Sequence, residues 1–164
     1  MLRPKIQDAF NAHVTEELFS AHLYLAMAAH AEAKAFKGFG RWLRLQHQEE
    51  LSHALKLLDQ LLDRGGKASL GAVAAPGAEF GSMLQVFEAV LAHERKVTES
   101  LDAFYQLAAG ERDAATQVFL QWFVTEQVEE EKSAQEIVDR LRLVSDRPGS
   151  ALYLDKEYGK RGKA

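Results

Sequence analysis

The chain has 164 residues, a formal charge of -4 and no cysteine, which excludes disulfide frameworks, zinc ribbons, cysteine-bound iron-sulfur clusters and thiol nucleophiles. Hydrophobic residues make up 47% and charged residues 27%, a balance that favours one domain over residues 1–164 with a substantial core. No apolar run of about 18 residues could span a membrane, and the charged N-terminal stretch is unlike a signal peptide, so we expect a cytoplasmic protein. The acidic balance argues against nucleic acid as a partner.

Helical periodicity begins close to the N-terminus. Residues 5–33 hold no glycine or proline after Pro4, which is tolerated in a first helical turn, and they predict a long helix. A second helix is predicted over 39–64 and ends at a glycine pair. The glycine-rich stretch 66–82 indicates one long loop.

The second half of the chain repeats this pattern. Helices are predicted over 83–109 and 113–144, with Asp113 as the N-cap of the latter. A turn at Arg147–Ser150 precedes a segment, 151–158, that is too short to be a stable helix alone. We expect the basic tail 159–164 to be frayed and solvated.

The connection lengths predict an all-α four-helix bundle. Short links join the first helix to the second and the third to the fourth, so each pair is an antiparallel hairpin. A loop of about 17 residues can extend to roughly 56 Å, more than the ~40 Å length of a 27-residue helix. One long crossover of this kind is typical of ferritin-like bundles, to which the short fifth helix is added.

Each long helix carries a glutamate in the middle of its apolar stripe. Stepping three and four residues from Phe87 along the third helix meets only apolar positions except Glu94. The same stepping places polar residues in the middle of the other three stripes, among them Glu17, Gln46, Glu50, His53, Gln127 and Glu130. Because they lie near the middle of long helices, these residues reach a similar height in the bundle whichever way each helix runs.

A bound metal would explain this layer. One buried ionised carboxylate without compensation costs several kcal/mol, so four in one core would be unfavourable without cations. Oxygen-rich ligation with one imidazole suits iron or manganese, and carboxylates can bridge two ions. The sequence therefore predicts a dinuclear site whose ligands are Glu17, Glu50, His53, Glu94 and Glu130.

Tyr24, two turns from Glu17, is either a core residue or a hydrogen-bond and electron donor to this site. The other five histidines and both tryptophans are interpreted as structural or exposed residues.

A second apolar stripe lies on the second helix, away from the predicted ligands. It consists of Leu51, Leu55, Leu58 and Leu62. A helix that is apolar on two sides is buried on two sides, so the stripe predicts subunit contacts and a homo-oligomer.

The chain resembles the bacterial non-haem ferritins over nearly its whole length. The resemblance is carried by Glu16-Glu17-Leu18 through Tyr24, Gln48-Glu49-Glu50-Leu51-Ser52-His53, His93-Glu94, Phe119-Leu120-Gln121-Trp122-Phe123-Val124, Glu126-Gln127 and Glu129-Glu130-Glu131-Lys132. Leu152-Tyr153 and Asp155-Lys156-Glu157 also resemble the fifth helix of the family.

The resemblance implies a cytoplasmic iron store with ferroxidase activity. Glu17, Glu50 and His53 would hold a first iron, and Glu50 would bridge to a second iron on Glu94 and Glu130, with Gln127 beside it. A third, inward-lying iron site would map to Glu49, Glu126 and Glu129, which periodicity does not find. The family further implies a hollow cage of 24 subunits with 432 symmetry and the fifth helices near its fourfold axes. Fe(II) and either dioxygen or hydrogen peroxide would be the substrates, and Tyr24 a source of one additional electron.

Three alternatives remain. Bacterioferritins bind haem through a methionine and carry a second Glu-x-x-His motif, but here Ser52 and the Gln127-x-x-Glu130 motif stand at those places, so no haem is expected. A storage shell without ferroxidase activity is disfavoured by the complete set of site glutamates. A di-iron oxygenase would need a substrate-binding insertion, which the sequence does not contain.

Overall fold

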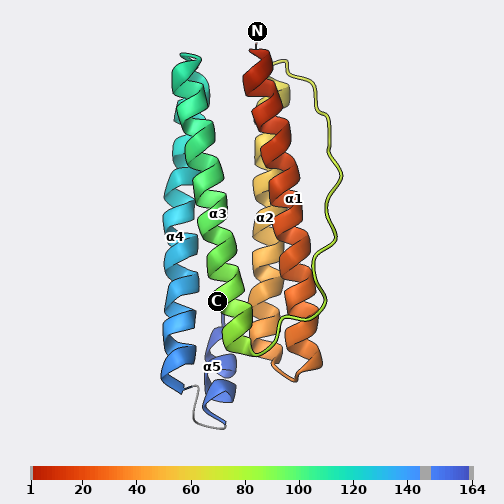
Figure 1. Cartoon of the computed structure of the whole chain (residues 1–164), viewed down its shortest axis with the longest axis vertical. Helices are drawn as coiled ribbons and strands as arrows, with labels where there is room; N and C mark the ends of the chain where they lie inside the picture. Colours follow the sequence, from red (N-terminus) through yellow and green to blue (C-terminus); the bar gives the residue numbers. More distant parts are fainter. Residues whose placement is uncertain (1, 145–148, 163–164) are drawn as a thin grey trace.

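The computed structural model describes residues 2–144 and 149–162, and it forms five helices and no strand within them. The helices are α1 (Pro4–Ala33), α2 (Lys37–Asp63), α3 (Met83–Gly110), α4 (Ala114–Val144) and the short α5 (Ser150–Tyr158). The predicted bundle with a short fifth helix is therefore confirmed (Figure 1). Within these residues, no helix is both long and apolar enough to cross a membrane.

The long connection between α2 and α3 sets the topology. It runs beside α1 along the length of the bundle, so that α2 and α3 point the same way (Figure 1). Three polar residues one helical turn apart on α1 hold it there. Gln7 Oε1 accepts a hydrogen bond from Lys67 N at 2.9 Å, and Asn11 Oδ1 accepts one from Ser69 N at 2.7 Å. Thr15 Oγ1 accepts from Gly71 N at 3.2 Å, so the connection satisfies part of its backbone on α1.

The core is divided into two apolar clusters. One lies towards the α1–α2 turn and includes Tyr24, Phe39, Phe87 and Ile137; the other lies towards the opposite end and includes Ile6, Phe10, Leu61 and Phe123. On each long helix, the buried polar residues of the mid-helix stripe lie between the residues of the two clusters: Glu17, Gln46, Glu50, His53, Glu94, Gln127 and Glu130. This division is the three-dimensional form of the stripes that are apolar at their ends and polar in the middle.

Side chains cap the starts of two helices, and one of these caps was predicted from the sequence. Asp113 Oδ1 accepts a hydrogen bond from Thr116 N at 3.0 Å, which confirms Asp113 as the cap of α4. Its other oxygen accepts from Arg64 Nη1 at 2.8 Å, which ties the end of α2 to the start of α4. Ser82 and Gln85 form a reciprocal capping box at the start of α3.

The start of α2 lies two residues earlier than predicted. The reason is a side chain remote in sequence: Asp155 Oδ1 in α5 accepts a hydrogen bond from Phe39 N at 2.7 Å. One of the unpaired backbone donors of the first turn of α2 is thereby satisfied.

The prediction of a frayed tail is wrong for the described part of it, residues 159–162. The Arg161 side chain is 29% exposed and forms an ion pair with Glu49 of α2. Residues 163–164 lie outside the described residues, and so do Arg147 and Pro148 of the predicted turn. Ser150, the last residue of that turn, is the first residue of α5.

Candidate metal centre

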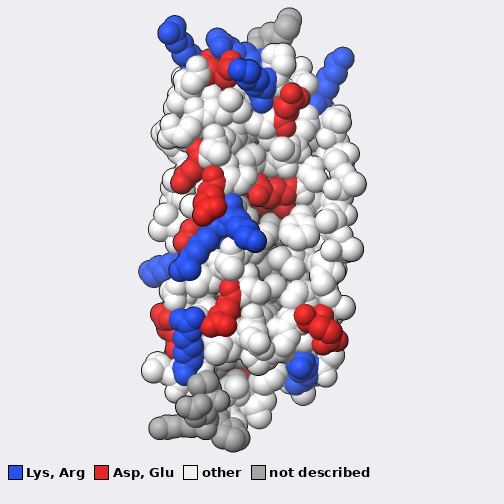
Figure 2. All heavy atoms as spheres, in the orientation of Figure 1, with Lys and Arg blue, Asp and Glu red and all other residues white. Residues whose placement is uncertain are grey.

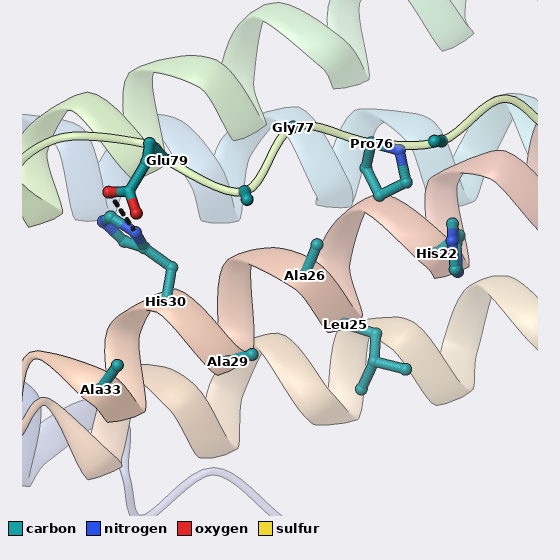
Figure 3. A pocket seen from close by; sticks show the side chains of 11 residues that line it. His22, Leu25, Ala26, Ala29, His30, Ala33, Pro76, Gly77 and Glu79 are labelled. Atoms are coloured by element: carbon teal, nitrogen blue, oxygen red, sulfur yellow. Dashed lines mark ion pairs between the residues drawn. The ribbon is translucent and has the colours of Figure 1, made fainter.

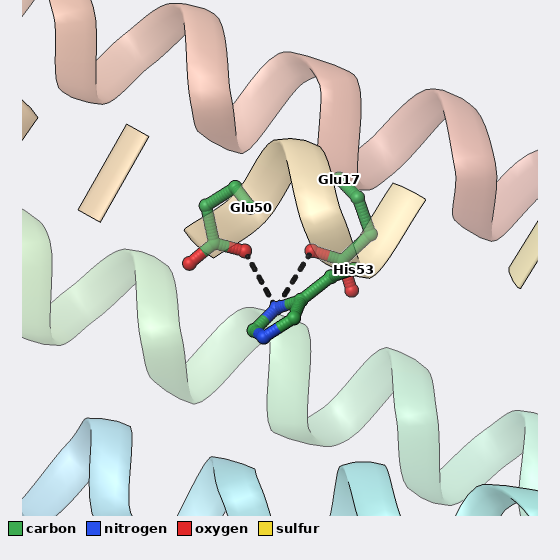
Figure 4. Close-up of side chains that lie close together, drawn as sticks. All are labelled: Glu17, Glu50 and His53. Carbon is green, nitrogen blue, oxygen red and sulfur yellow. Dashed lines mark hydrogen bonds and ion pairs between the residues drawn. The ribbon is translucent and has the colours of Figure 1, made fainter. Parts of the chain in front are cut away.

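Glu17, Glu50 and His53 form the tightest group of possible ligands. Each offers one ligand atom, and these atoms all lie within 4.8 Å of one another. His53 Nδ1 lies 3.2 Å from Glu50 Oε2 and 3.9 Å from Glu17 Oε2 (Figure 4). Glu50 and His53 are three residues apart on α2, so they share the face turned towards Glu17 of α1. At 4%, 4% and 5% exposure, the three side chains are buried.

The other two predicted ligands lie in the same layer. Glu94 of α3 and Glu130 of α4 are 3% and 7% exposed. Gln46 joins the two halves of the bundle, because its Nε2 donates to Glu50 Oε1 at 3.3 Å and to Glu130 Oε2 at 2.5 Å. All four long helices thus contribute a carboxylate to one buried layer, as the stripes predict.

Two further predicted residues contact Glu94. Gln127 Nε2 donates to Glu94 Oε2 at 2.6 Å and to its backbone carbonyl at 3.1 Å. The Tyr24 hydroxyl, which is fully buried, donates to Glu94 Oε1. Tyr24 is thus both a residue of the apolar core and a hydrogen-bond donor to Glu94, while its role as an electron donor stays a prediction.

One carboxylate oxygen in this layer lacks a donor. Among the described residues, Glu17 Oε2 is the one buried side-chain polar atom without a hydrogen-bond partner. Its 3.9 Å separation from His53 Nδ1 is too long for a hydrogen bond. Buried acceptors of this kind are rare, and a cation between Glu17, Glu50 and His53 would satisfy it.

Burial makes three of the glutamates poor acids. Burial, then the charges of Glu94 and Glu50, raises the pKa of Glu130 to about 9. Burial and the charge of Glu50 raise the pKa of Glu94 to about 7 and hold that of Glu17 well above its usual value. In the metal-free protein at neutral pH, Glu94 is therefore about half protonated and Glu130 is largely protonated.

Glu50 and His53 behave in the opposite way. Burial alone would raise the pKa of Glu50, but hydrogen bonds with His53, Glu17 and Gln46 lower it. Burial alone would lower the pKa of His53, but its bond to Glu50 and the Glu50 charge raise it. The Glu50 carboxylate, beside the His53 imidazole, is thus ionised at neutral pH.

Comparison with known proteins agrees with this geometry. The ferritin-like domain family matches residues 7–144. A bacterial non-heme ferritin of Bacteroides fragilis is 40% identical over 98% of this chain and 100% of its own length, and one of Staphylococcus epidermidis is 37% identical over 98% and 97%. The chain belongs to the ferritin family. Among solved structures, one described as an open pore ferritin from Archaeoglobus fulgidus is 44% identical over 98% of this chain and 99% of that one, with a TM-score of 0.97.

As a ferritin, the chain is an iron-storage protein, and the bacterial non-haem resemblance inferred from its motifs is confirmed. The three residues mapped to an inner iron site are more open in this ferritin than the paired site. Glu49 and Glu126 are half-buried and Glu129 is exposed. Glu49 and Glu126 lie close enough for their charges to raise the pKa of His53. The inner site remains a prediction, and so does the expectation of no haem.

Gln46 lies in the stripe of the second helix, but it was not predicted to take part in the site. In this ferritin it is fully buried and is the residue that links Glu50 to Glu130. The signal was available, because an amide in the middle of an apolar stripe needs partners.

The interpretation of the histidines as structural holds for His30 and His47, which bond to the backbone carbonyls of Gly81 and Ala21. His13, a buried member of the α1 stripe, lies 3.3 Å from Glu16, which is not in that stripe.

A groove elsewhere on this ferritin is less suited to chemistry. It lies between α1 and the connection, with a volume of about 620 Å³, and alanines form much of its wall (Figure 3). Its polar members include His22, His30 and Glu79, and His30 lies 3.8 Å from Glu79. The buried carboxylates do not line it, so the groove is not part of the metal centre.

Proposed function

We propose that this ferritin oxidises Fe(II) at a paired site in the middle of its bundle and stores the product as ferric mineral inside a cage. The observation that carries the proposal is the buried layer of five ligands from four helices, in which Glu17 keeps an unpaired oxygen. Such a layer is unfavourable with all its carboxylates ionised and becomes favourable once cations occupy it.

Two iron positions follow from the contacts. Glu17, Glu50 and His53 would bind one Fe(II), since their ligand atoms already lie together. Glu94 and Glu130 would bind the other, with Glu50 reaching both ions and Gln127 held against Glu94. Hard anionic oxygen ligands favour Fe(III) over Fe(II), which promotes oxidation once both ions are in place.

The electron and proton balance of the reaction is simple. Each of two Fe(II) ions gives one electron, and dioxygen takes both with two protons to become hydrogen peroxide. The pKa values of Glu94 and Glu130 are raised to about 7 and about 9, so their carboxyl groups would release protons when they bind iron. Tyr24 would supply one more electron through its contact with Glu94 where the oxidant requires it. Hydrogen peroxide could replace dioxygen as the oxidant.

The test is aerobic oxidation of Fe(II) by the iron-free protein, followed by the absorbance of Fe(III). Wild type should oxidise about two Fe(II) per chain in a fast phase that buffer lacks, while Glu50→Ala with His53→Ala should lose this phase. Glu88→Ala is the control, because Glu88 is an outer residue that pairs with Arg142 at 2.8 Å. A fast phase that survives in the double variant would contradict the site assignment. Loss of the phase with retained slow mineral formation would leave only a storage shell.

The cage is part of the proposal. The resemblance implies a cytoplasmic cage of twenty-four subunits with 432 symmetry and with α5 near the fourfold axes. A similar archaeal ferritin has an open pore form and an engineered closed form, so the subunit arrangement of this protein is itself to be tested. The inner site of Glu49, Glu126 and Glu129 would lie on the route from the paired site to the mineral.

A further inference from the structure

The end of the chain is built onto α2 beside the iron centre. Asp155 caps the start of α2, and a Cβ on Gly159 would lie 2.9 Å from Gly38 Cα, so this crossing is as close as glycine allows. Further on, the backbone carbonyl of Arg161 accepts a hydrogen bond from Arg41 Nε at 3.4 Å. Residues 155–161 are therefore held at several successive points along α2.

These anchors carry the Arg161 guanidinium to the edge of the buried layer. Its Nη1 donates to Gln46 Oε1 at 2.8 Å and its Nη2 donates to Glu49 Oε2 at 2.6 Å. The guanidinium carbon also lies 4.6 Å from the centre of the Trp42 ring, in a cation–π contact. One charged group thus has an amide, a carboxylate and an aromatic face as partners.

The contact with Gln46 extends into the iron centre. An amide has one accepting and one donating end, and a guanidinium can only donate. Arg161 therefore holds Gln46 with its oxygen outward and its Nε2 towards Glu50 and Glu130. A row of hydrogen bonds leads from the chain end to two iron ligands.

The contact with Glu49 places a cation where the inner iron site is expected. A zinc ion bound to Glu49 Oε2 would lie about 2 Å from that oxygen, and so within roughly 5 Å of the Arg161 nitrogen that now donates to it. Two cations at that separation on one half-buried carboxylate repel each other strongly. The Arg161 guanidinium and a metal ion therefore compete for the Glu49 carboxylate.

We propose that Arg161 is a built-in counter-ion of the inner acidic site, and that a divalent cation binding at Glu49 takes its place. The inference rests on the proposed function, since it concerns the third metal position of the same centre. Before iron arrives, Arg161 neutralises Glu49 and keeps Gln46 oriented; an ion entering at Glu49 frees the guanidinium from both Gln46 and Trp42.

The experiment uses the assembled iron-free protein and Zn²⁺, which cannot be oxidised. Trp122→Phe leaves Trp42 as the single tryptophan, because the chain has two. Calorimetry counts zinc ions per chain while Trp42 emission follows the guanidinium. In this background, the first two equivalents should leave the emission largely unchanged, and a third should shift it.

Variants of Arg161 separate displacement from a general effect on folding. Arg161→Gln should bind the third zinc ion roughly fivefold tighter, since no resident cation competes, and should show no emission shift with it. Arg161→Lys keeps the charge but cannot make both hydrogen bonds of the guanidinium. Its affinity for the third zinc ion should lie between those of wild type and Arg161→Gln. Lys160→Gln is the matched control, because Lys160 pairs with Glu157 at 2.7 Å and not with Glu49.

The outcomes are distinct. Two tight zinc ions with no third ion, or a third ion of equal affinity in wild type and Arg161→Gln, would overturn the role of Arg161 and leave the paired site intact. A third ion that leaves Trp42 emission unchanged in the Arg161-containing protein would overturn it as well. If the wild-type protein does not bind two zinc ions tightly, the proposed function is contradicted, and this inference with it.

Discussion

The carboxylates of the buried layer are stabilised in different ways in the metal-free protein. Glu50 is ionised and hydrogen-bonded to His53, while Glu94 accepts from Tyr24 and Gln127. Glu130 accepts, among the described residues, from the Gln46 amide alone, and burial raises its pKa to about 9. Holding the layer together without iron therefore depends on protonation, and so on pH.

Glu130→Gln should make the iron-free protein more stable in alkaline solution. Because the folded pKa of Glu130 is raised to about 9, the folded state binds more protons than the unfolded state between pH ~4.5 and ~9. Stability is thus lost as the pH rises through this window. Glutamine needs no proton, so at pH 8 the variant should gain ~2 kcal/mol or more over wild type, with the gain vanishing near pH 4. Unfolding midpoints across this pH range provide the measurement.

The neighbouring Glu131→Gln is the control for that series. Glu131 is half-buried, accepts from Thr98 Oγ1 of α3 at 2.5 Å, and is not one of the buried carboxylates of the layer. A difference between Glu130→Gln and wild type that stays constant with pH would show that the carboxyl carries no raised pKa in the folded protein.

The burial of residues in the helical stripes was predictable from periodicity. Contacts between residues that are far apart in the sequence were not. Glu94 stands alone in an otherwise apolar stripe, so its burial and its need for partners follow from its position. Arg161 lies in a short basic tail whose composition is that of a solvated end. Its partners, Gln46 and Glu49, are 115 and 112 residues away in sequence, and only the docking of α5 brings them together.

At the level of the elements, helix ends connect segments that the sequence leaves separate. Asp113 caps α4 and also binds Arg64 at the end of α2, so one side chain joins the two helix pairs of the bundle. The cap was predictable from local sequence, since aspartate before a helical stretch is a common start signal. The bond to Arg64 was not, because it depends on how the hairpins pack.

Replacing Asp113 should separate these two roles. Asp113→Ala removes the cap and leaves Arg64 without its carboxylate, at a cost of ~2–3 kcal/mol. Asp113→Asn keeps an oxygen for Thr116 N but turns an amide NH2, which cannot accept, towards Arg64. It therefore keeps the cap, loses the ion pair, and should cost about half as much. Thermal unfolding midpoints of the assembled proteins compare the two. Glu111→Ala, which breaks exposed ion pairs with Arg3 and Lys5, is the control and should leave the midpoint nearly unchanged. Equal losses in both Asp113 variants would assign the whole effect to the ion pair.

On the scale of the whole molecule, a single chain leaves apolar surface uncovered. Leu51, Leu55 and Leu62 of the predicted second stripe are 37%, 58% and 50% exposed, and Leu58 is half-buried. The connection adds Leu70 at 60% exposure, and the surface over it on the face seen in Figure 2 is largely uncharged. The sequence predicted that this stripe would be buried on both sides of α2, and within one chain three of its leucines are not. A second subunit would cover them.

Charging this stripe should therefore prevent assembly and not folding. Leu55→Glu with Leu62→Glu places two carboxylates on surface that an oligomer would bury, and uncompensated buried charge costs several kcal/mol at each copy of the interface. Size-exclusion chromatography with light scattering should show small species in place of a cage, while circular dichroism keeps the helical signal. Leu143→Glu, which charges the 82% exposed leucine of α4, is the control. Because the proposed iron ligands all come from one chain, the small species should retain fast Fe(II) oxidation, but without a cavity the ferric product should precipitate. A double variant that still forms a full cage would show that the leucine stripe is not the subunit contact.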